Sequence, residues 1–267
     1  MTTAPYSPAA ADESEPETSR SSHRPRAGLE VLLVLGVSLG ISAISSWINF
    51  LDIQTRGGFR HATATLNPST SVREWVDLSY QLLGILNGVL PAFLALYLLW
   101  LWPGRPGFGI GLDGRRIGPD LLRGAGFALL IGVPGLALIY TARKLGINAQ
   151  LDASDIAAVW YRYPVLVLSA MQNAVAEEII MIGFLLTRFR QLRWPATRAV
   201  LVSALIRGSY HTYQGIGGFV GNFLMGLIFG WWFTRTRRVL PLVIAHSLLD
   251  IVSFVGYAAL HGRASWL

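Results

Sequence analysis

The chain has 267 residues, of which 52% are hydrophobic and only 14% are charged, and its mean hydropathy is +0.46. This composition is typical of a polytopic membrane protein and excludes a soluble globular domain. The net charge of +7 comes from arginines in short connections between apolar segments, so it indicates membrane topology and not nucleic-acid binding. Because there is no cysteine, disulfides, thiolate metal sites and cysteine nucleophiles are excluded.

Polar and charged residues dominate the first 28 positions, which lack the apolar content to form a core. We therefore predict a disordered cytoplasmic tail over residues 1–28. Seven apolar segments follow, at residues 29–51, 79–102, 119–141, 163–187, 199–213, 217–233 and 239–260. Residues 52–78 are too polar to cross a membrane and are expected to form a folded outer loop. The fold prediction is an all-α, polytopic bundle of about seven to eight transmembrane helices.

Basic residues are distributed unequally among the connections between these segments. If the N-terminus is inside, the inner segments hold thirteen basic residues and the outer segments hold seven. The positive-inside rule then favours a cytoplasmic N-terminus. We expect a multi-pass protein of the cell membrane, with the lipid bilayer as a partner.

Six ionisable side chains fall inside the apolar segments of the C-terminal half: Glu177, Glu178, Arg207, His211, His246 and Asp250. A charged side chain in mid-membrane costs at least about 2.5–3.5 kcal/mol, so each residue marks a candidate functional site. At a helical rise of about 1.5 Å per residue, all six lie roughly 12–20 Å from the inner boundary. His246 and Asp250 are four residues apart and share a helix face, as do Arg207 and His211. We therefore predict that the six side chains meet in one cavity.

Two glutamates, two imidazoles and a guanidinium in a pocket of low dielectric constant favour acid–base chemistry. A glutamate held between desolvation and a nearby cation can act as a general base near neutral pH, as the activation of water requires. A histidine can stabilise the developing oxyanion. No serine or threonine stands out as a nucleophile in these segments. The pattern therefore predicts hydrolysis by an activated water molecule inside the membrane.

Two other interpretations stay open at this stage. The cluster could be a buried polar network that only fixes helix packing. It could also relay protons or bind a cation in a transporter, although no repeat relates the two halves of the chain. Metal dependence is open as well. Glu177, His211 and His246 form a plausible zinc set by ligand type, but no HExxH spacing supports it, and a metal-free glutamate mechanism is the favoured alternative.

Three sequence motifs carry a family resemblance: AEEIIMIGF at 176–184, RGSYH at 207–211 and HSLLD at 246–250. They resemble the EExxxR, FxxxH and HxxxN/D motifs of the CAAX-protease and bacteriocin-processing (CPBP, or Abi) family of intramembrane proteases. The resemblance covers roughly residues 163–255. It implies a catalytic core over residues 163–260. The apolar segments before this core predict N-terminal transmembrane helices over residues 29–162, and residues 261–267 form a short tail.

By this resemblance the protein is an endopeptidase that acts on a peptide or protein substrate. Glu177 matches the glutamate that activates water, and Glu178 matches its acidic neighbour. His211 matches the histidine that shares the water. His246 and Asp250 match the pair assigned to the oxyanion site. Members of the family are described both as metalloproteases and as metal-free glutamate proteases.

The chain departs from the family motifs at two positions, and its third motif ends in aspartate instead of asparagine. Ile182 replaces the arginine of EExxxR, and Arg207 replaces the phenylalanine of FxxxH. We predict that Arg207 supplies the charge that Ile182 lacks by pairing with Glu178 or Glu177, since a lone buried arginine would be prohibitive. Asp250 replaces asparagine, and an ionised aspartate cannot donate a hydrogen bond to an oxyanion. Asp250 would therefore have one of three roles: to stay protonated, to orient His246 or to bind a metal. These changes also leave open a non-proteolytic scaffold or bacteriocin-immunity protein on the same fold.

Overall fold

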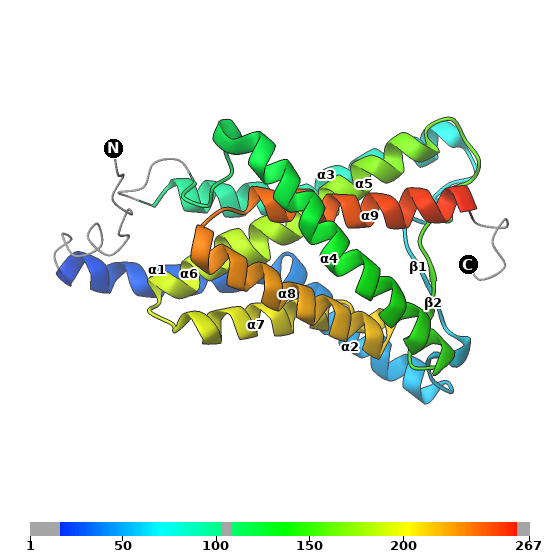
Figure 1. Cartoon of the computed structure of the whole chain (residues 1–267), viewed down its shortest axis with the longest axis horizontal. Helices are drawn as coiled ribbons and strands as arrows, with labels where there is room; N and C mark the ends of the chain where they lie inside the picture. The colour runs from blue at the N-terminus through cyan, green and yellow to red at the C-terminus, as the bar shows by residue number, and fades with distance from the viewer. Residues whose placement is uncertain (1–16, 103–107, 261–267) are drawn as a thin grey trace.

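The computed structural model describes residues 17–102 and 108–260, with side chains from residue 26 onward, and helices make up most of this part of the chain (Figure 1). The α-helices are α1 Glu17–Gly36, α2 Leu39–Thr55, α3 Glu74–Trp100, α4 Ile117–Lys144, α5 Arg162–Glu177, α6 Leu185–Gln191, α7 Ala196–Ser209, α8 Ile216–Thr236 and α9 Leu240–Leu260. Shorter helical turns are η1 Phe59–His61, η2 Gly114–Arg116, η3 Glu178–Phe184 and η4 Thr212–Gln214, and the strands are β1 Thr63–Thr65 and β2 Gln150–Asp152.

Each of the seven predicted apolar segments overlaps a helix, so the all-α membrane bundle is confirmed. Among the described residues, five helices are long and apolar enough to cross a membrane, or six if a bent pair counts as one span. That pair is Arg26–Gly36 and Leu39–Thr55, which meet at 48°. The predicted count of seven to eight is larger because α7 has only 14 residues. At about 1.5 Å per residue it reaches about 21 Å, short of the roughly 30 Å hydrocarbon core.

Helix α1 begins at Glu17, within the segment 1–28 that the sequence analysis assigned to a disordered tail. Two contacts explain why the helix extends beyond the apolar segment. Arg26 pairs with Glu30 one turn later at 2.9 Å, and Ala27 is fully buried. Glu30 in turn lies 2.5 Å from the buried Arg188 of α6, which ties α1 to the bundle. Residues 1–16 and the predicted C-terminal tail, 261–267, lie outside the described residues.

The polar segment 52–78 forms a folded connection between α2 and α3, as predicted. Its strand β1 pairs in parallel with β2 of the α4–α5 connection, with Ala64 opposite Leu151. Phe59 and Ala149 are buried in a small apolar cluster beside this pairing. Two connections far apart in the sequence therefore cover one end of the helix bundle together (Figure 1).

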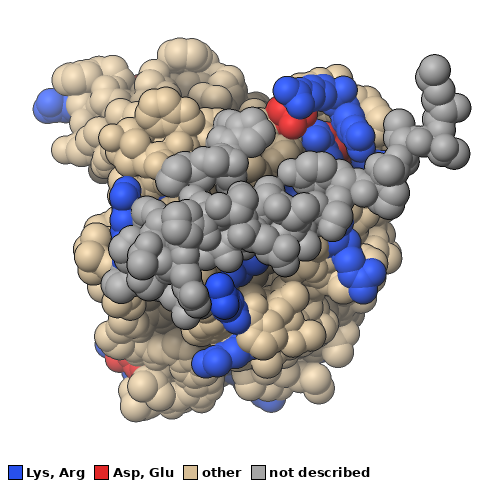
Figure 2. Space-filling model, turned by 90° about the vertical axis from the view of Figure 1, so that its left-hand side faces the viewer, with Lys and Arg blue, Asp and Glu red and all other residues tan. Residues whose placement is uncertain are grey.

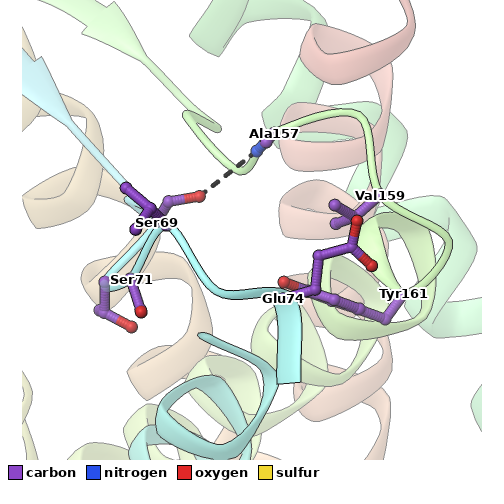
Figure 3. Close-up of a pocket in the computed structure, with 8 residues that line it drawn as sticks. Ser69, Ser71, Glu74, Ala157, Val159 and Tyr161 are labelled. Atoms are coloured by element: carbon purple, nitrogen blue, oxygen red, sulfur yellow. Dashed lines mark hydrogen bonds between the residues drawn. The ribbon is translucent and has the colours of Figure 1, made fainter. Parts of the chain in front are cut away.

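A pocket of about 450 Å³ lies between the same two connections (Figure 3). Beneath it, the Tyr161 hydroxyl donates a hydrogen bond to Asp77 at 2.9 Å. Burial and this hydrogen bond raise the pKa of Tyr161 to about 12. Tyr161 and Glu177 are separated by the length of α5, about 24 Å at the usual helical rise. The pocket is therefore remote from the predicted polar cavity. Its lining residues are Ser69, Thr70, Ser71, Val72, Glu74, Ala157, Val159 and Tyr161.

Close packing of α7 against α8 fixes the position of the second motif. A Cβ atom at Gly226 would lie 2.9 Å from the Ala204 Cα and 3.3 Å from the Arg207 Cδ. A Cβ at Gly230 would lie 2.8 Å from a methyl group of Val200. Only glycine allows this approach, which is typical of small-residue interfaces between membrane helices. The short helix α7 is thereby held with Arg207 directed into the bundle.

Candidate active site

The first motif lies on a π-helical segment. Helix α5 continues without interruption into η3, a seven-residue π-helix that begins at Glu178 and runs into α6. All seven residues of η3 are buried, Ile182 among them. Consecutive residues of a regular α-helix diverge by about 100°, yet Glu177 and Glu178 both contact one guanidinium here. Such π-helical segments are rare and occur frequently at functional sites.

Arg207 is the centre of the polar cluster. Its Nη2 atom lies 3.2 Å from Glu177 Oε2 and makes a close contact with Glu178 Oε1, while Nη1 lies 3.4 Å from Glu178 Oε2. The side chain is fully buried, and its guanidinium carbon lies 5.6 Å from the centroid of the Phe229 ring. The ion pair predicted between Arg207 and the two glutamates is therefore present. The Arg207 guanidinium balances the negative charge of the two buried carboxylates, which Ile182 cannot do.

His246 is held by polar contacts to Glu178 and Arg207. Its Nδ1 atom lies 2.8 Å from Glu178 Oε1 and 3.3 Å from Arg207 Nη2. Because arginine can only donate and the carboxylate accepts, the shorter contact indicates that the Nδ1 proton is donated to Glu178. On the other side of the ring, Nε2 lies 3.6 Å from Asp250 Oδ1, which is too long for a direct hydrogen bond. The predicted pairing of His246 with Asp250 on one helix face is present as a near contact.

The two oxygens of Glu177 differ in their surroundings. Oε2 accepts hydrogen bonds from the Tyr210 hydroxyl at 2.7 Å and from Arg207. Oε1 lies 3.8 Å from His211 Nε2, beyond hydrogen-bonding distance. That nitrogen is buried and has no hydrogen-bond partner among the described residues. A free carboxylate oxygen and a free ring nitrogen therefore face each other across a short gap.

The structure thus brings the six predicted residues into one contiguous cluster from three segments of the chain: α5 with η3, the end of α7 with the turn after it, and α9. Two further residues contact the cluster, of which Tyr210 was missed by the sequence analysis. Tyr210 donates to Glu177, and Gln214 Nε2 lies 3.3 Å from His211 Nδ1. The signal for Tyr210 was its spacing, since it lies three residues after Arg207 and therefore on the same helical face.

The side chains do not assemble the zinc set that ligand type suggested. Among the described residues, no group of three or more His, Asp or Glu side chains is arranged to hold a metal ion. His246 directs Nδ1 to Glu178, whereas Glu177 uses Oε2 for Tyr210 and Arg207. These contacts occupy one polar atom of Glu177 and one of His246, and they leave Glu177 Oε1 and His246 Nε2 without a direct hydrogen bond to a described residue.

Comparison with known proteins agrees with the motif analysis. Residues 159–252 match the family model described as type II CAAX prenyl endopeptidase Rce1-like, and this range includes all six residues of the cluster. A comparison with curated proteins found no match, and a comparison with solved structures found none. The candidate spans and this match fit a multi-pass membrane protein of a CAAX-protease type. The family resemblance inferred from the three motifs is confirmed: over residues 159–252 the chain is similar to the Rce1-like type II CAAX prenyl endopeptidases, consistent with the CPBP family.

Proposed function

We propose that the protein is an intramembrane endopeptidase in which Glu177 and His211 activate a water molecule. The observation that carries this proposal is the gap of 3.8 Å between Glu177 Oε1 and His211 Nε2, two atoms without a direct partner among the described residues. A water molecule beside this gap can lie at about 2.8 Å from both atoms. Tyr210 and Arg207 occupy the other carboxylate oxygen, which keeps Oε1 available as the proton acceptor.

In the proposed reaction, the water oxygen attacks the carbonyl carbon of the scissile peptide bond while Glu177 Oε1 takes one of its protons. His211 Nε2 holds the same water and orients it. Collapse of the tetrahedral intermediate breaks the carbon–nitrogen bond, and the proton held by Glu177 passes to the leaving amine. The products are a new carboxylate and a new amine, so no other reactant is required.

We assign oxyanion stabilisation to His246. Glu178 accepts the Nδ1 proton at 2.8 Å and fixes the ring, so that Nε2 is the atom left to donate to the developing charge. Asp250 lies 3.6 Å from Nε2 and, when ionised, can only accept hydrogen bonds. Its role in this scheme is to orient the ring and favour its protonated form. Arg207 compensates the charge of the two glutamates and touches no substrate atom.

The proposed substrate is a peptide with a prenylated C-terminal CAAX sequence, because the matched family is described as CAAX prenyl endopeptidases. The protein would lie in the cell membrane with its N-terminus in the cytoplasm, because the positive-inside rule favours this orientation for the distribution of basic residues in the chain. The cluster would then lie near the middle of the bilayer, where water is scarce and electrostatic interactions are strong.

The direct test uses the full chain reconstituted in phospholipid vesicles with prenylated and unprenylated CAAX reporter peptides in water enriched in ¹⁸O. We expect cleavage of the prenylated peptide, with ¹⁸O in the new C-terminal carboxylate detected by mass spectrometry. If folded and inserted protein cleaves neither peptide, the protease proposal is wrong and a scaffold on the same fold is favoured. Proton or cation flux into the vesicles without cleavage would favour a transporter instead.

Replacement of Tyr210 by phenylalanine is expected to lower kcat by about tenfold and to leave KM nearly unchanged. The variant keeps the ring but removes the hydrogen bond that fixes Glu177 Oε2, so Oε1 is less well directed at the water. Steady-state cleavage of the reporter peptide separates the two constants. The matched control is Tyr80→Phe, an exposed tyrosine of α3. A rise in KM at constant kcat would contradict a positioning role for Tyr210.

A further inference from the structure

One end of the bundle carries a surface of unpaired arginines, which we call the arginine face. It consists of Arg115, Arg116, Arg190, Arg193, Arg198 and Arg235, all of which are exposed. They come from the starts of α4 and α7, the ends of α6 and α8, and the turn between α6 and α7. Figure 2 looks onto this end of the molecule and shows basic side chains spread over it, with few acidic ones. None of the six forms an ion pair with a described side chain.

The acidic side chains described at this end are already compensated. Arg238 contacts Asp120 at 2.6 Å and Asp113 at 3.2 Å, and its hydrogen bonds hold the pKa of Asp113 below the usual range. Glu30 is buried and pairs with Arg188. These carboxylates therefore leave the positive charge of the arginine face uncompensated.

Two of the arginines are held in place by tryptophans. The Arg198 guanidinium lies 4.2 Å from the centroid of the Trp194 ring, and the Arg235 guanidinium lies 5.3 Å from the Trp231 ring. Trp194 is itself stacked on Phe189, with centroids 4.2 Å apart. When an arginine stacks on an aromatic ring, the N–H donors at the edge of its planar guanidinium group stay free. Two of these donors can bind two phosphate oxygens at once.

The opposite end of the bundle is different in charge. There Arg56 pairs with Asp52, and Arg143 donates to the Gln150 side chain. Glu74 and Asp155 are exposed at that end as well. Among the described residues, basic and acidic side chains are therefore mixed at that end, whereas basic side chains without an ion pair predominate on the arginine face.

We infer that the arginine face binds the headgroups of anionic phospholipids at one surface of the membrane. Arg190 and Arg235 lie in the last turns of two candidate spans, at the level where headgroup phosphates begin. Clusters of four to eight basic residues next to a membrane span attract anionic lipids, with about 1 kcal/mol for each side chain near the surface. Tryptophan is also favoured at this level of the bilayer. This inference does not depend on the proposed protease activity.

The test is selective lipid retention by the full-length protein. The protein is reconstituted in vesicles of equal amounts of phosphatidylglycerol and phosphatidylcholine and extracted in mild detergent, and the retained lipids are counted by native mass spectrometry. We expect about tenfold enrichment of phosphatidylglycerol over phosphatidylcholine. Equal retention of the two lipids would overturn the inference.

Two triple variants locate the binding surface. Arg193→Gln, Arg198→Gln and Arg235→Gln together are expected to lose most of the enrichment. The same change at Arg56, Arg60 and Arg73, which are exposed at the opposite end, is expected to retain it. A third variant with lysine at positions 193, 198 and 235 keeps the charge and should retain at least half of the enrichment. Equal losses in the two glutamine variants would contradict the assignment to this face.

A competition measurement separates lipid from free phosphate. Inorganic phosphate at about 10 mM is expected to leave the lipid retained, since a single soluble anion lacks the multiple contacts of headgroups in a membrane plane. Displacement of phosphatidylglycerol by inorganic phosphate would show a site for a soluble anion and would overturn the lipid assignment.

Discussion

Replacement of Glu177 by glutamine is expected to lower kcat/KM for peptide hydrolysis by about 10²–10⁴-fold, the range that general-base catalysis contributes. Glutamine has the same shape and its carbonyl oxygen can still accept the hydrogen bond from Tyr210, but its amide cannot take a proton from water. The measurement is cleavage of the reporter peptide by the reconstituted protein, together with its thermal unfolding midpoint in detergent.

The matched control is Glu74→Gln. Glu74 is exposed at the start of α3, at the opposite end of α5 from Glu177, so its replacement should leave cleavage within about twofold of wild type. Thermal unfolding of Glu177→Gln should remain close to that of wild type. Undiminished cleavage by Glu177→Gln would remove this glutamate from the mechanism, and loss of folding alone would favour a structural role for the cluster.

Replacement of Arg207 by leucine is expected to reduce the free energy of unfolding by about 3–5 kcal/mol. The change leaves Glu178 buried without its guanidinium partner, and an uncompensated buried charge has a cost of this size. Reversible unfolding in mixed micelles with increasing denaturant measures the difference. If the leucine variant is as stable as wild type, the ion pair does not have the structural importance given to it here.

A double variant tests whether the charge has moved from one helix to another. Ile182→Arg combined with Arg207→Phe restores the residues of the family motifs. Position 182 is four residues after Glu178 and is fully buried, so an arginine there can reach the same carboxylate. We expect the double variant to recover at least half of the stability lost in Arg207→Phe alone. Losses that simply add in the double variant would contradict the relocation.

Much of this architecture was predictable because helical periodicity and buried charge are local properties of the sequence. The six cluster residues could be placed at a common depth from rise per residue alone, and the pairing of Arg207 followed from the cost of a lone buried charge. The choice of partners could not be predicted in full. Both glutamates contact Arg207, and the first of the two is followed by a π-helical segment, which no sequence pattern identifies reliably.

Other contacts were missed because they join segments that are distant in the sequence. Glu30 lies within the first predicted apolar segment, and its ion pair with Arg188 depends on the arrangement of α1 beside α6. Likewise, the hydrogen bond from Tyr161 to Asp77 joins the start of α5 to the first turn of α3, two positions 84 residues apart in the sequence. The described helices that could cross a membrane number five or six against the seven to eight predicted, because the fifth apolar segment, which is short in the sequence as well, folds into the 14-residue helix α7.

The central claim is that Glu177 and His211 act on one water molecule, and a double-mutant cycle tests it most directly. Cleavage is measured for Glu177→Gln, His211→Ala and the double variant under identical conditions. Because either change alone should leave the water without activation, the double variant is expected to be no slower than the slower single variant. If the two losses instead multiply, the residues act independently and the shared-water mechanism is wrong.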